Sequence, residues 1–375
     1  MANQSYLKRI NRQRILLAVR ESGPLSRSAI ADLLALDRKS MTNLANELIA
    51  EGWLCETGVD YSSRGRPGTL LDLDRTQHLF LGLHLSENQA SGVLLNLSGE
   101  ILGRQERPYA PVAFLKDIRA VLQEVYLPLL RLAGGKLHAI GLVLPGILDF
   151  ASATVQRSVN IPVLDGVELR RLLPRELPSE LYFEESSRAK ALAELWFGQG
   201  QGRSSFVCVD LGIGIGAGII LEKHLQGGPY AGEIGHVIIQ PEGRQCACGH
   251  RGCLEAYISE SILCRELSQA LQQPIATLDE VGALNPAAEA VLAQAGRALG
   301  LGLATIVNIL CPPLVILHGS LLRFAQQIFP AMEDSLATAA LPSCRSRVEV
   351  RVSSFGAEAA ALGAAAVPLG RVFLG

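Results

Sequence analysis

The chain has 375 residues, of which 49% are hydrophobic, 19% charged and 5% aromatic, and its formal net charge is −2. This length allows two or three domains with buried cores, and the composition is typical of a soluble α/β protein. The charge is uneven, because residues 1–70 hold ten Lys/Arg against seven Asp/Glu while the remainder carries a net −5. A basic head on an acidic body favours nucleic-acid binding by the head.

The N-terminal segment 1–14 carries four basic residues but lacks an apolar core of the secretory type. We therefore expect a cytoplasmic location, where the eight cysteines stay reduced.

Three helices are predicted in residues 1–52. Apolar residues recur at helical spacing from Leu7 to Val19, and Gly23-Pro24 ends this first helix. Ser26 is the predicted cap of a second helix that runs through Leu34. Asp37 is the predicted cap of a third helix that runs to about Glu51 and ends at Gly52. The side chains expected to face inward are Ile30, Leu33, Leu34, Met41, Leu44, Leu48 and Ile49.

Two short strands, Trp53–Thr57 and Thr69–Leu73, are predicted next, joined by a basic loop. This order predicts a winged helix-turn-helix domain over 1–75, in which the exposed start of the third helix enters the major groove. The side chains there that are able to reach bases and phosphates are Arg38, Lys39, Ser40, Thr42 and Asn43. In the loop, Arg64 and Arg66 are expected to clamp the backbone or probe the minor groove. The alternative is a small helical protein-interaction domain with a solvated charged face.

Further strands and helices are predicted along the body. The predicted strands are Leu79–Leu85, Ala90–Leu97, Glu100–Arg107, Ala139–Leu144, Leu181–Phe183, Phe206–Asp210, Gly216–Leu221, His236–Ile239 and Leu314–Leu317. We expect helix-plus-strand units to end in the fourth and fifth of these strands. The apolar segment Leu299–Leu317 is interrupted by Pro312-Pro313, so we interpret it as a buried helix and strand, with a membrane span as the remote alternative.

Three cysteines follow a histidine in the middle of the chain. His236, Cys246, Cys248 and Cys253 suit a tetrahedral zinc ion with one imidazole and three thiolates. Gly249 and Gly252 allow the tight turns that this loop needs. No ligand position is left open, so the ion is expected to be structural. His250 is the alternative fourth ligand, although its spacing to Cys248 is short, and unconnected reduced thiols are the simpler alternative.

With the winged head, these motifs resemble the ROK family of repressors, open reading frames and kinases. The resemblance rests on Gly232-Glu-Ile-Gly-His236 and the run Cys246–Glu255, and more weakly on Leu144-Pro145-Gly146 and Arg188–Glu194. It implies an α/β body of two actin- or hexokinase-like lobes with a ligand cleft between them. The expected lobes are 76–185 with a returning C-terminal helix at about 357–375, and 186–356 with the zinc site.

The resemblance also identifies the positions that a sugar kinase of this family needs, and three of them have changed. His84 to Asn88 occupy the first phosphate turn, whose usual pattern is Asp-x-Gly-x-Thr. Ile213 stands at the hydroxyl position of the second, glycine-rich turn, Gly212 to Gly218, which has a plain strand pair as its alternative interpretation. Ser186 stands where the family has the aspartate that acts as general base. Phosphoryl transfer depends on these groups, so we expect no enzyme and no catalytic residues.

Sugar recognition is better preserved. The positions that match the family's sugar contacts are Gly146, Asn160, Glu233, His236 and Glu255. Glu185, which with Ser186 replaces the family's Asn-Asp pair, is predicted to be a further sugar contact. Carboxylates accept hydroxyl protons well, and the alternative role of Glu233 and Glu255 is support of the zinc loop.

The sequence therefore predicts a DNA-binding transcriptional regulator, a repressor in particular, whose body senses a sugar or sugar-like effector. Its expected partners are double-stranded operator DNA, the effector, and further copies of the chain in a homodimer or tetramer. Two alternatives remain. One is an ATP-dependent sugar kinase with a DNA-binding head, and the other is a regulator controlled by a protein such as a sugar transporter component.

Overall fold

The computed structural model describes residues 2–60, 68–175, 177, 180–228 and 230–375. These residues divide into two units, 1–186 with 360–375 and 187–359. Arg64 and Arg66 lie outside the described residues.

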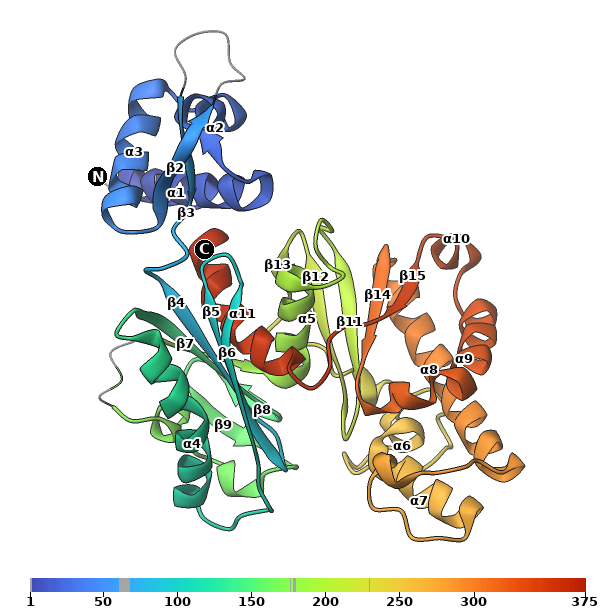
Figure 1. Ribbon diagram of the computed structural model, residues 1–375. Helices are drawn as coiled ribbons and strands as arrows, with labels where there is room; N and C mark the ends of the chain where they lie inside the picture. The colour runs from blue at the N-terminus through green and yellow to red at the C-terminus, as the bar shows by residue number, and fades with distance from the viewer. Residues whose placement is uncertain (1, 61–67, 176, 178–179, 229) are drawn as a thin grey trace. The chain divides into compact units, whose positions relative to one another are not determined.

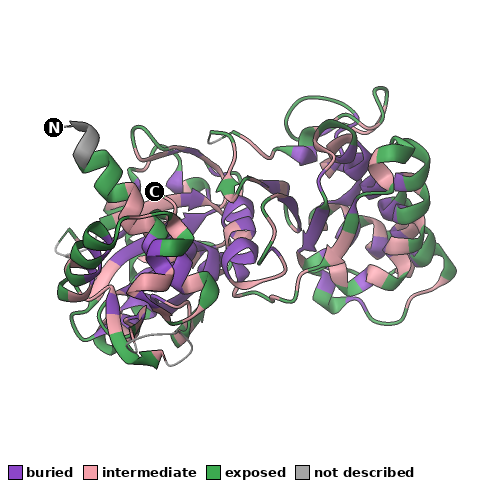
Figure 2. Ribbon diagram, turned by 90° about the horizontal axis from the view of Figure 1, so that it is seen from above, coloured by how far each residue is buried: buried purple, intermediate pink, exposed green. Residues whose placement is uncertain are grey.

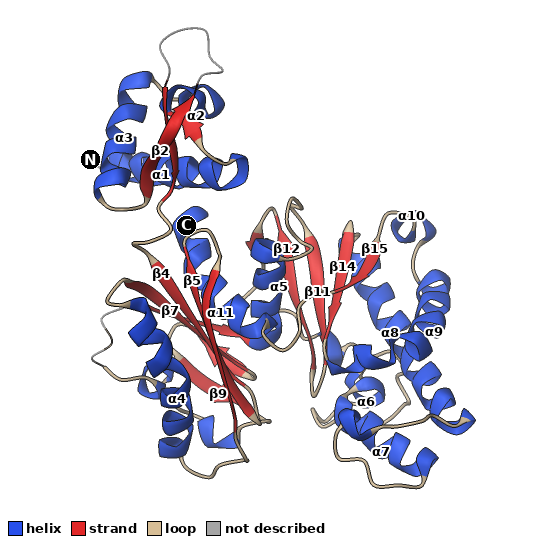
Figure 3. Ribbon diagram, viewed as in Figure 1, coloured by secondary structure: helices blue, strands red, loops and turns tan. Residues whose placement is uncertain are grey.

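The head of unit 1 has three helices and a three-stranded sheet of order β1-β3-β2 (Figure 3). Its elements are α1 (Ala2–Ser22), β1 (Leu25–Ser26), α2 (Arg27–Leu34), α3 (Arg38–Ala50), β2 (Leu54–Asp60) and β3 (Gly68–Leu73). Ser26 and Asp37 cap α2 and α3 as predicted, because their side chains accept hydrogen bonds from the N–H groups of Ala29 and Ser40. The short β1 was not predicted.

Most of the head's predicted core is buried, including Ile30, Met41, Leu44 and Leu48. The prediction that Leu33 faces inward is wrong, since 60% of this residue is exposed. It lies roughly 100° around α2 from the face that Ile30 and Ala31 bury. The flanking Leu34 and Ile49 are only partly buried.

The rest of unit 1 is built on a five-stranded sheet of order β10-β7-β4-β5-β6. Its elements are β4 (Leu79–Leu85), β5 (Gln89–Asn96), β6 (Ile101–Pro108), α4 (Leu115–Ala133), β7 (Leu137–Leu144), β8 (Ile147–Asp149), β9 (Thr154–Arg157), η1 (Pro162–Leu164), η2 (Leu169–Leu172), β10 (Glu180–Glu185) and α11 (Ala359–Phe373). The prediction of a helix before the strand β10 is wrong. Between β7 and β10 the described residues form a β-hairpin and two 3-10 turns, where Pro162 and Gly166 interrupt any longer helix.

The C-terminal helix α11 packs directly on this sheet (Figure 1). Gly82 of β4 and Gly141 of β7 are paired across the sheet. A Cβ at Gly141 would lie 1.8 Å from the carbonyl oxygen of Ala364, and one at Gly82 would lie 2.1 Å from that of Ala361. The two glycines therefore form a flat patch that admits the helix backbone itself.

Unit 2 contains a second five-stranded sheet, of order β13-β12-β11-β14-β15, and a set of helices. Its elements are α5 (Ser186–Phe197), β11 (Phe206–Leu211), β12 (Ile215–Leu221), β13 (His224–Leu225), η3 (Ile234–His236), α6 (Glu255–Ile258), α7 (Glu260–Leu271), η4 (Leu278–Glu280), α8 (Pro286–Leu310), β14 (Leu314–His318), η5 (Ser320–Phe324), α9 (Ala325–Ala339), α10 (Pro342–Arg345) and β15 (Glu349–Val352). In each unit the buried residues concentrate on the sheet and on the helix faces that cover it (Figure 2).

Two predictions about apolar segments of unit 2 had different outcomes. Helix α8 is long and apolar enough to cross a membrane, but 56% of its most apolar window is buried inside the structure, which agrees with the predicted core helix. The prediction of a strand at His236–Ile239 is wrong. Residues 234–236 form a 3-10 turn, and Ile238 makes only an isolated β-bridge with Cys253.

Candidate functional site

The proposed DNA-reading face lies on the first turns of α3. Arg38, Lys39, Ser40, Thr42 and Asn43 are all exposed. The hydroxyl of Thr42 donates to the carbonyl of Arg38 at 2.8 Å, and Arg38 forms an ion pair with Asp32 at 2.9 Å. Both partners of that pair are largely exposed, so releasing Arg38 to a phosphate costs little, about 0–1 kcal/mol.

The metal-binding residues come together in unit 2. One ligand atom each from His236, Cys246, Cys248 and Cys253 lies within 4.8 Å of the others. The sulfurs of Cys248 and Cys253 are 3.6 Å apart, and the sulfur of Cys246 is 3.8 Å from Nδ1 of His236. Ligands at about 2.1–2.3 Å in a tetrahedron around zinc are themselves about 3.6–3.8 Å apart. The donor set and its spacing therefore fit one tetrahedral zinc ion.

The loop that carries the thiols depends on its glycines. Gly249 and Gly252 have φ of +97° and +78°. A Cβ at Gly252 would lie 1.7 Å from the carbonyl oxygen of Gln240, so no other residue fits there. Hydrogen bonds from Leu254 N–H to the Val237 carbonyl and from Ile239 N–H to the Gly252 carbonyl tie the loop to the segment after η3.

The three thiols have different electrostatic surroundings. The backbone N–H of His250 is the main group that lowers the pKa of Cys248, to about 6. Burial instead raises the pKa of Cys253 to about 12, and it also raises that of Cys246. Cations favour thiolates, so metal binding would deprotonate the two buried thiols and release protons.

The alternative ligand His250 lies next to this group. Its Nδ1 is 3.6 Å from the sulfur of Cys248. It does not, however, belong to the group of four whose ligand atoms all lie within 4.8 Å of one another.

Two carboxylates of the predicted sugar site adjoin the metal group. Oε2 of Glu233 lies 3.9 Å from Nε2 of His236, the ring nitrogen opposite the one that faces Cys246. Glu255, at the start of α6, accepts a hydrogen bond from the N–H of Ile215 at 3.1 Å. Burial raises the pKa of Glu233, and the negative charge of Glu255 adds to this while His236 opposes it. Glu233 therefore lies close to the imidazole of His236, on the side away from Cys246.

The remaining predicted sugar contacts, Gly146, Asn160 and Glu185, belong to unit 1. Gly146, with φ of +123°, forms the turn between β7 and β8, and a Cβ there would lie 2.5 Å from the Arg157 carbonyl oxygen. Asn160 is half-buried after β9. Glu185 ends β10 and is also half-buried.

The structure brings together two of the three positions at which we expected altered kinase residues. Nε2 of His84, on β4, lies 3.4 Å from Oγ of Ser186 at the start of α5. Ile213 belongs to unit 2, where 38% of it is exposed. The glycine-rich segment agrees with close packing as well as with phosphate binding. A Cβ at Gly218 would lie 2.3 Å from that of Ala191 on α5.

Sequence reasoning missed a buried polar group beside this segment. Asp210, at the end of β11, forms an ion pair with Lys190 at 2.6 Å and accepts from Ser187 at 3.4 Å. Its second oxygen, Oδ1, is buried and has no hydrogen-bond partner among the described residues. The signal in the sequence was an acidic residue at the end of a fully apolar strand, directly before a glycine turn.

Comparison with known proteins decides the family. The model of the ROK family matches residues 80–370. The chain belongs to the ROK family. It is 26% identical to the xylose repressor of Bacillus spizizenii over 98% of this chain and 97% of that protein.

Solved ROK structures agree with the fold. A ROK family transcriptional regulator, described as a homologue of the Escherichia coli MLC protein, matches with a TM-score of 0.84 and 26% identity over 98% of this chain and 96% of that one. A ROK hexokinase from Thermus thermophilus matches with a TM-score of 0.64 and 29% identity, over 77% of this chain and 97% of that one. The ROK family thus includes both repressors and kinases similar to this chain, and the kinase covers less of it.

Proposed function

We propose that this chain is a DNA-binding transcriptional regulator, acting as a repressor, whose body senses a sugar or sugar-like effector and has lost kinase activity. The observation that carries the proposal is the combination of a head with an exposed polar recognition helix and a body with His84 and Ser186 at kinase positions. Full-length similarity to repressors supports it. A cytoplasmic location follows from this proposal, since the operator is there.

Within this proposal, Arg38, Lys39, Ser40, Thr42 and Asn43 read the operator, with Arg64 and Arg66 on the backbone or in the minor groove. Two heads in a homodimer or tetramer would supply the affinity that one small domain lacks. Glu233, His236 and Glu255 in unit 2 and Gly146, Asn160 and Glu185 in unit 1 are the proposed effector contacts. One structural Zn²⁺ per chain, held by His236, Cys246, Cys248 and Cys253, would fix the ring of His236 so that Nε2 faces Glu233 and the effector.

Replacing Lys39 and Asn43 with alanine is expected to weaken binding to a selected duplex by about 10- to 100-fold, because each exposed side chain of α3 supplies a base or phosphate contact. The duplex would be selected from a random library on the intact protein, and affinity measured by fluorescence anisotropy. Lys136→Ala, an exposed lysine of the body, is the matched control. Unchanged affinity in the double variant would show that α3 does not read DNA.

The same duplex tests sensing. Xylose, glucose and N-acetylglucosamine would be titrated into the complex. One of them or a related sugar is expected to change operator affinity, because it binds one conformation of the body better than another and shifts the population toward it. Glu255→Gln should bind DNA normally and lose the response. Operator binding indifferent to every sugar tried, with the head intact, would remove the sensing half of the proposal and favour a protein partner.

The enzyme alternative predicts turnover that this proposal excludes. With ATP and each of the same sugars, we expect no ADP release above the blank, because Ser186 has no carboxylate to accept the sugar proton. Ser186→Asp should remain inactive, since His84 still occupies the first phosphate turn. Turnover by the unaltered chain at an ordinary enzyme rate, about 10 per second, would overturn the loss of kinase activity.

A further inference from the structure

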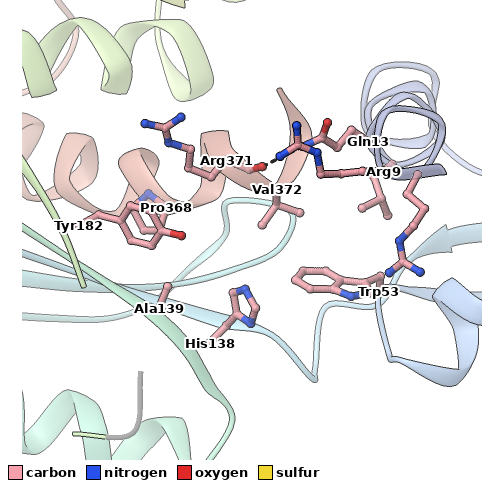
Figure 4. A pocket seen from close by; sticks show the side chains of 11 residues that line it. Arg9, Gln13, Trp53, His138, Ala139, Tyr182, Pro368, Arg371 and Val372 are labelled. Atoms are coloured by element: carbon pink, nitrogen blue, oxygen red, sulfur yellow. Dashed lines mark hydrogen bonds between the residues drawn. The ribbon is translucent and has the colours of Figure 1, made fainter. Parts of the chain in front are cut away.

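A pocket lies within unit 1 where the head meets the body, apart from the residues proposed to bind sugar. Its volume is about 200 Å³. Its walls come from three places in the chain: α1 and Trp53 of the head, β7 and β10 of the sheet, and the end of α11 (Figure 4). Helix α11 and α1 are also joined directly here, because the side-chain amide of Gln13 donates to the Arg371 carbonyl at 3.2 Å.

The lining of this pocket carries basic side chains and no acidic one. Three arginines and no Asp or Glu line it. Arg12 is committed elsewhere, since it pairs with Glu47 and Glu51. Arg9 and Arg371 are exposed, and no Asp or Glu side chain of the described residues lies within 4.0 Å of either guanidinium. Arg9 lies over the ring of Tyr6 at 5.6 Å, and Arg371 donates to an oxygen of Gly375 at 3.3 Å. Guanidinium groups without an acidic side-chain partner favour an oxyanion.

Apart from Gln13, the rest of the lining is aromatic or apolar. Figure 4 shows the rings of Trp53, His138 and Tyr182 around the space below the two arginines. Trp53 stacks on His78 at 3.7 Å and meets the edge of His138 at 4.9 Å, so its ring is fixed in place. Burial and the neighbouring His78 lower the pKa of His138, so its ring is uncharged at neutral pH and acts as a wall.

The volume of the pocket limits the size of the ligand that it can bind. A cavity of about 150 Å³ holds one benzene ring, so about 200 Å³ leaves room for a ring and a carboxylate. This is smaller than a typical site for a drug-sized ligand, about 300–1,000 Å³.

We propose that this pocket binds a small organic anion, in which a carboxylate is attached to a group no larger than one ring. Arg9 and Arg371 would supply the positive charge at the rim of the pocket. Such a ligand would touch α1 and Trp53 of the head together with α11 and the sheet. It would therefore act as a second effector that fixes the head on the body, independent of the sugar.

Benzoate is the probe, and Trp53 is its reporter. The chain has two tryptophans, so Trp196→Phe leaves Trp53 as the only fluorophore excited at long wavelength. We expect a saturable change in its fluorescence with one site per chain. Isothermal titration of the unaltered full-length chain should give the same dissociation constant, which guards against a folding defect in the variant. Arg9→Gln and Arg371→Gln should each weaken binding at least fivefold, and Arg104→Gln, an exposed arginine outside the pocket, should not.

Two further probes test the negative charge and the ring of the ligand separately. Benzyl alcohol has the ring without the charge, and inorganic phosphate has the charge without the ring, so each should bind at least tenfold more weakly than benzoate. Equal binding of either, no saturation with benzoate, or full affinity in both arginine variants would overturn the proposal. The titrations contain neither DNA nor sugar, so their outcome is independent of the proposed function.

Discussion

Cys253→Ser is expected to abolish stoichiometric zinc binding and to lower the thermal unfolding midpoint of unit 2 by about 10 °C or more. The thiol is fully buried and lies 3.6 Å from that of Cys248. Serine offers no thiolate, so the tetrahedral set would lose one of its two buried thiols. The free energy of binding a structural zinc ion is folding free energy, about 10–16 kcal/mol in zinc-finger peptides, so partial loss of the set removes several kcal/mol.

Metal content by mass spectrometry and unfolding by scanning calorimetry measure the two halves of this prediction. Cys55→Ser is the matched control, because Cys55 is a half-buried thiol of the head outside the metal group. We expect one zinc per chain in the unaltered protein and in the control. A full zinc content in Cys253→Ser, or an unchanged midpoint after zinc is removed by a chelator, would contradict a structural ion at this site.

Gly141→Ala is expected to destabilise unit 1 by about 3–5 kcal/mol, the range of severe overpacking. The added Cβ would lie 1.8 Å from the carbonyl oxygen of Ala364, which belongs to the helix backbone and cannot rotate away as a side chain would. Relief requires α11 to lift off the sheet, and that exposes the buried alanines of its inner face, Ala360, Ala361, Ala364 and Ala365.

Urea unfolding followed by circular dichroism measures this loss as a shift in midpoint at constant slope. Gly282→Ala is the control, because the space around a Cβ at Gly282 is open. A variant at Gly141 as stable as this control would show that α11 does not rest on the glycine patch.

The elements that sequence predicted well are those with a local signal. The strand Leu79–Leu85 was placed at its observed ends, because five of its seven residues are Leu or Phe and polar residues follow it. The caps Ser26 and Asp37 were found because a side-chain oxygen before a helix satisfies an N–H three residues on. Very short strands such as β1 and β13 exist only through their partners, so their own residues carry no pattern.

The site followed the same rule. The metal ligands were predictable because a zinc loop concentrates its thiols within a few residues. The pair Lys190 and Asp210 was not, because its members lie on different elements and the acidic residue in an apolar strand does not by itself identify its partner. Likewise Ile238 is exposed while Val237 and Ile239 pack on the core, an alternation that predicts a strand even where a single β-bridge is all that forms.

Helix α11 is the last element that the structure describes, yet it covers the sheet of unit 1. All strands of that sheet precede residue 186 in the sequence. During synthesis, the ribosome must therefore translate all of unit 2 before that face of the sheet can be closed. For this interval the nascent chain presents an apolar surface to the cell, and surfaces of this kind invite aggregation or chaperone binding. Nonsense mutations that remove only the final turns would then act through protein quality control before any regulatory defect appeared.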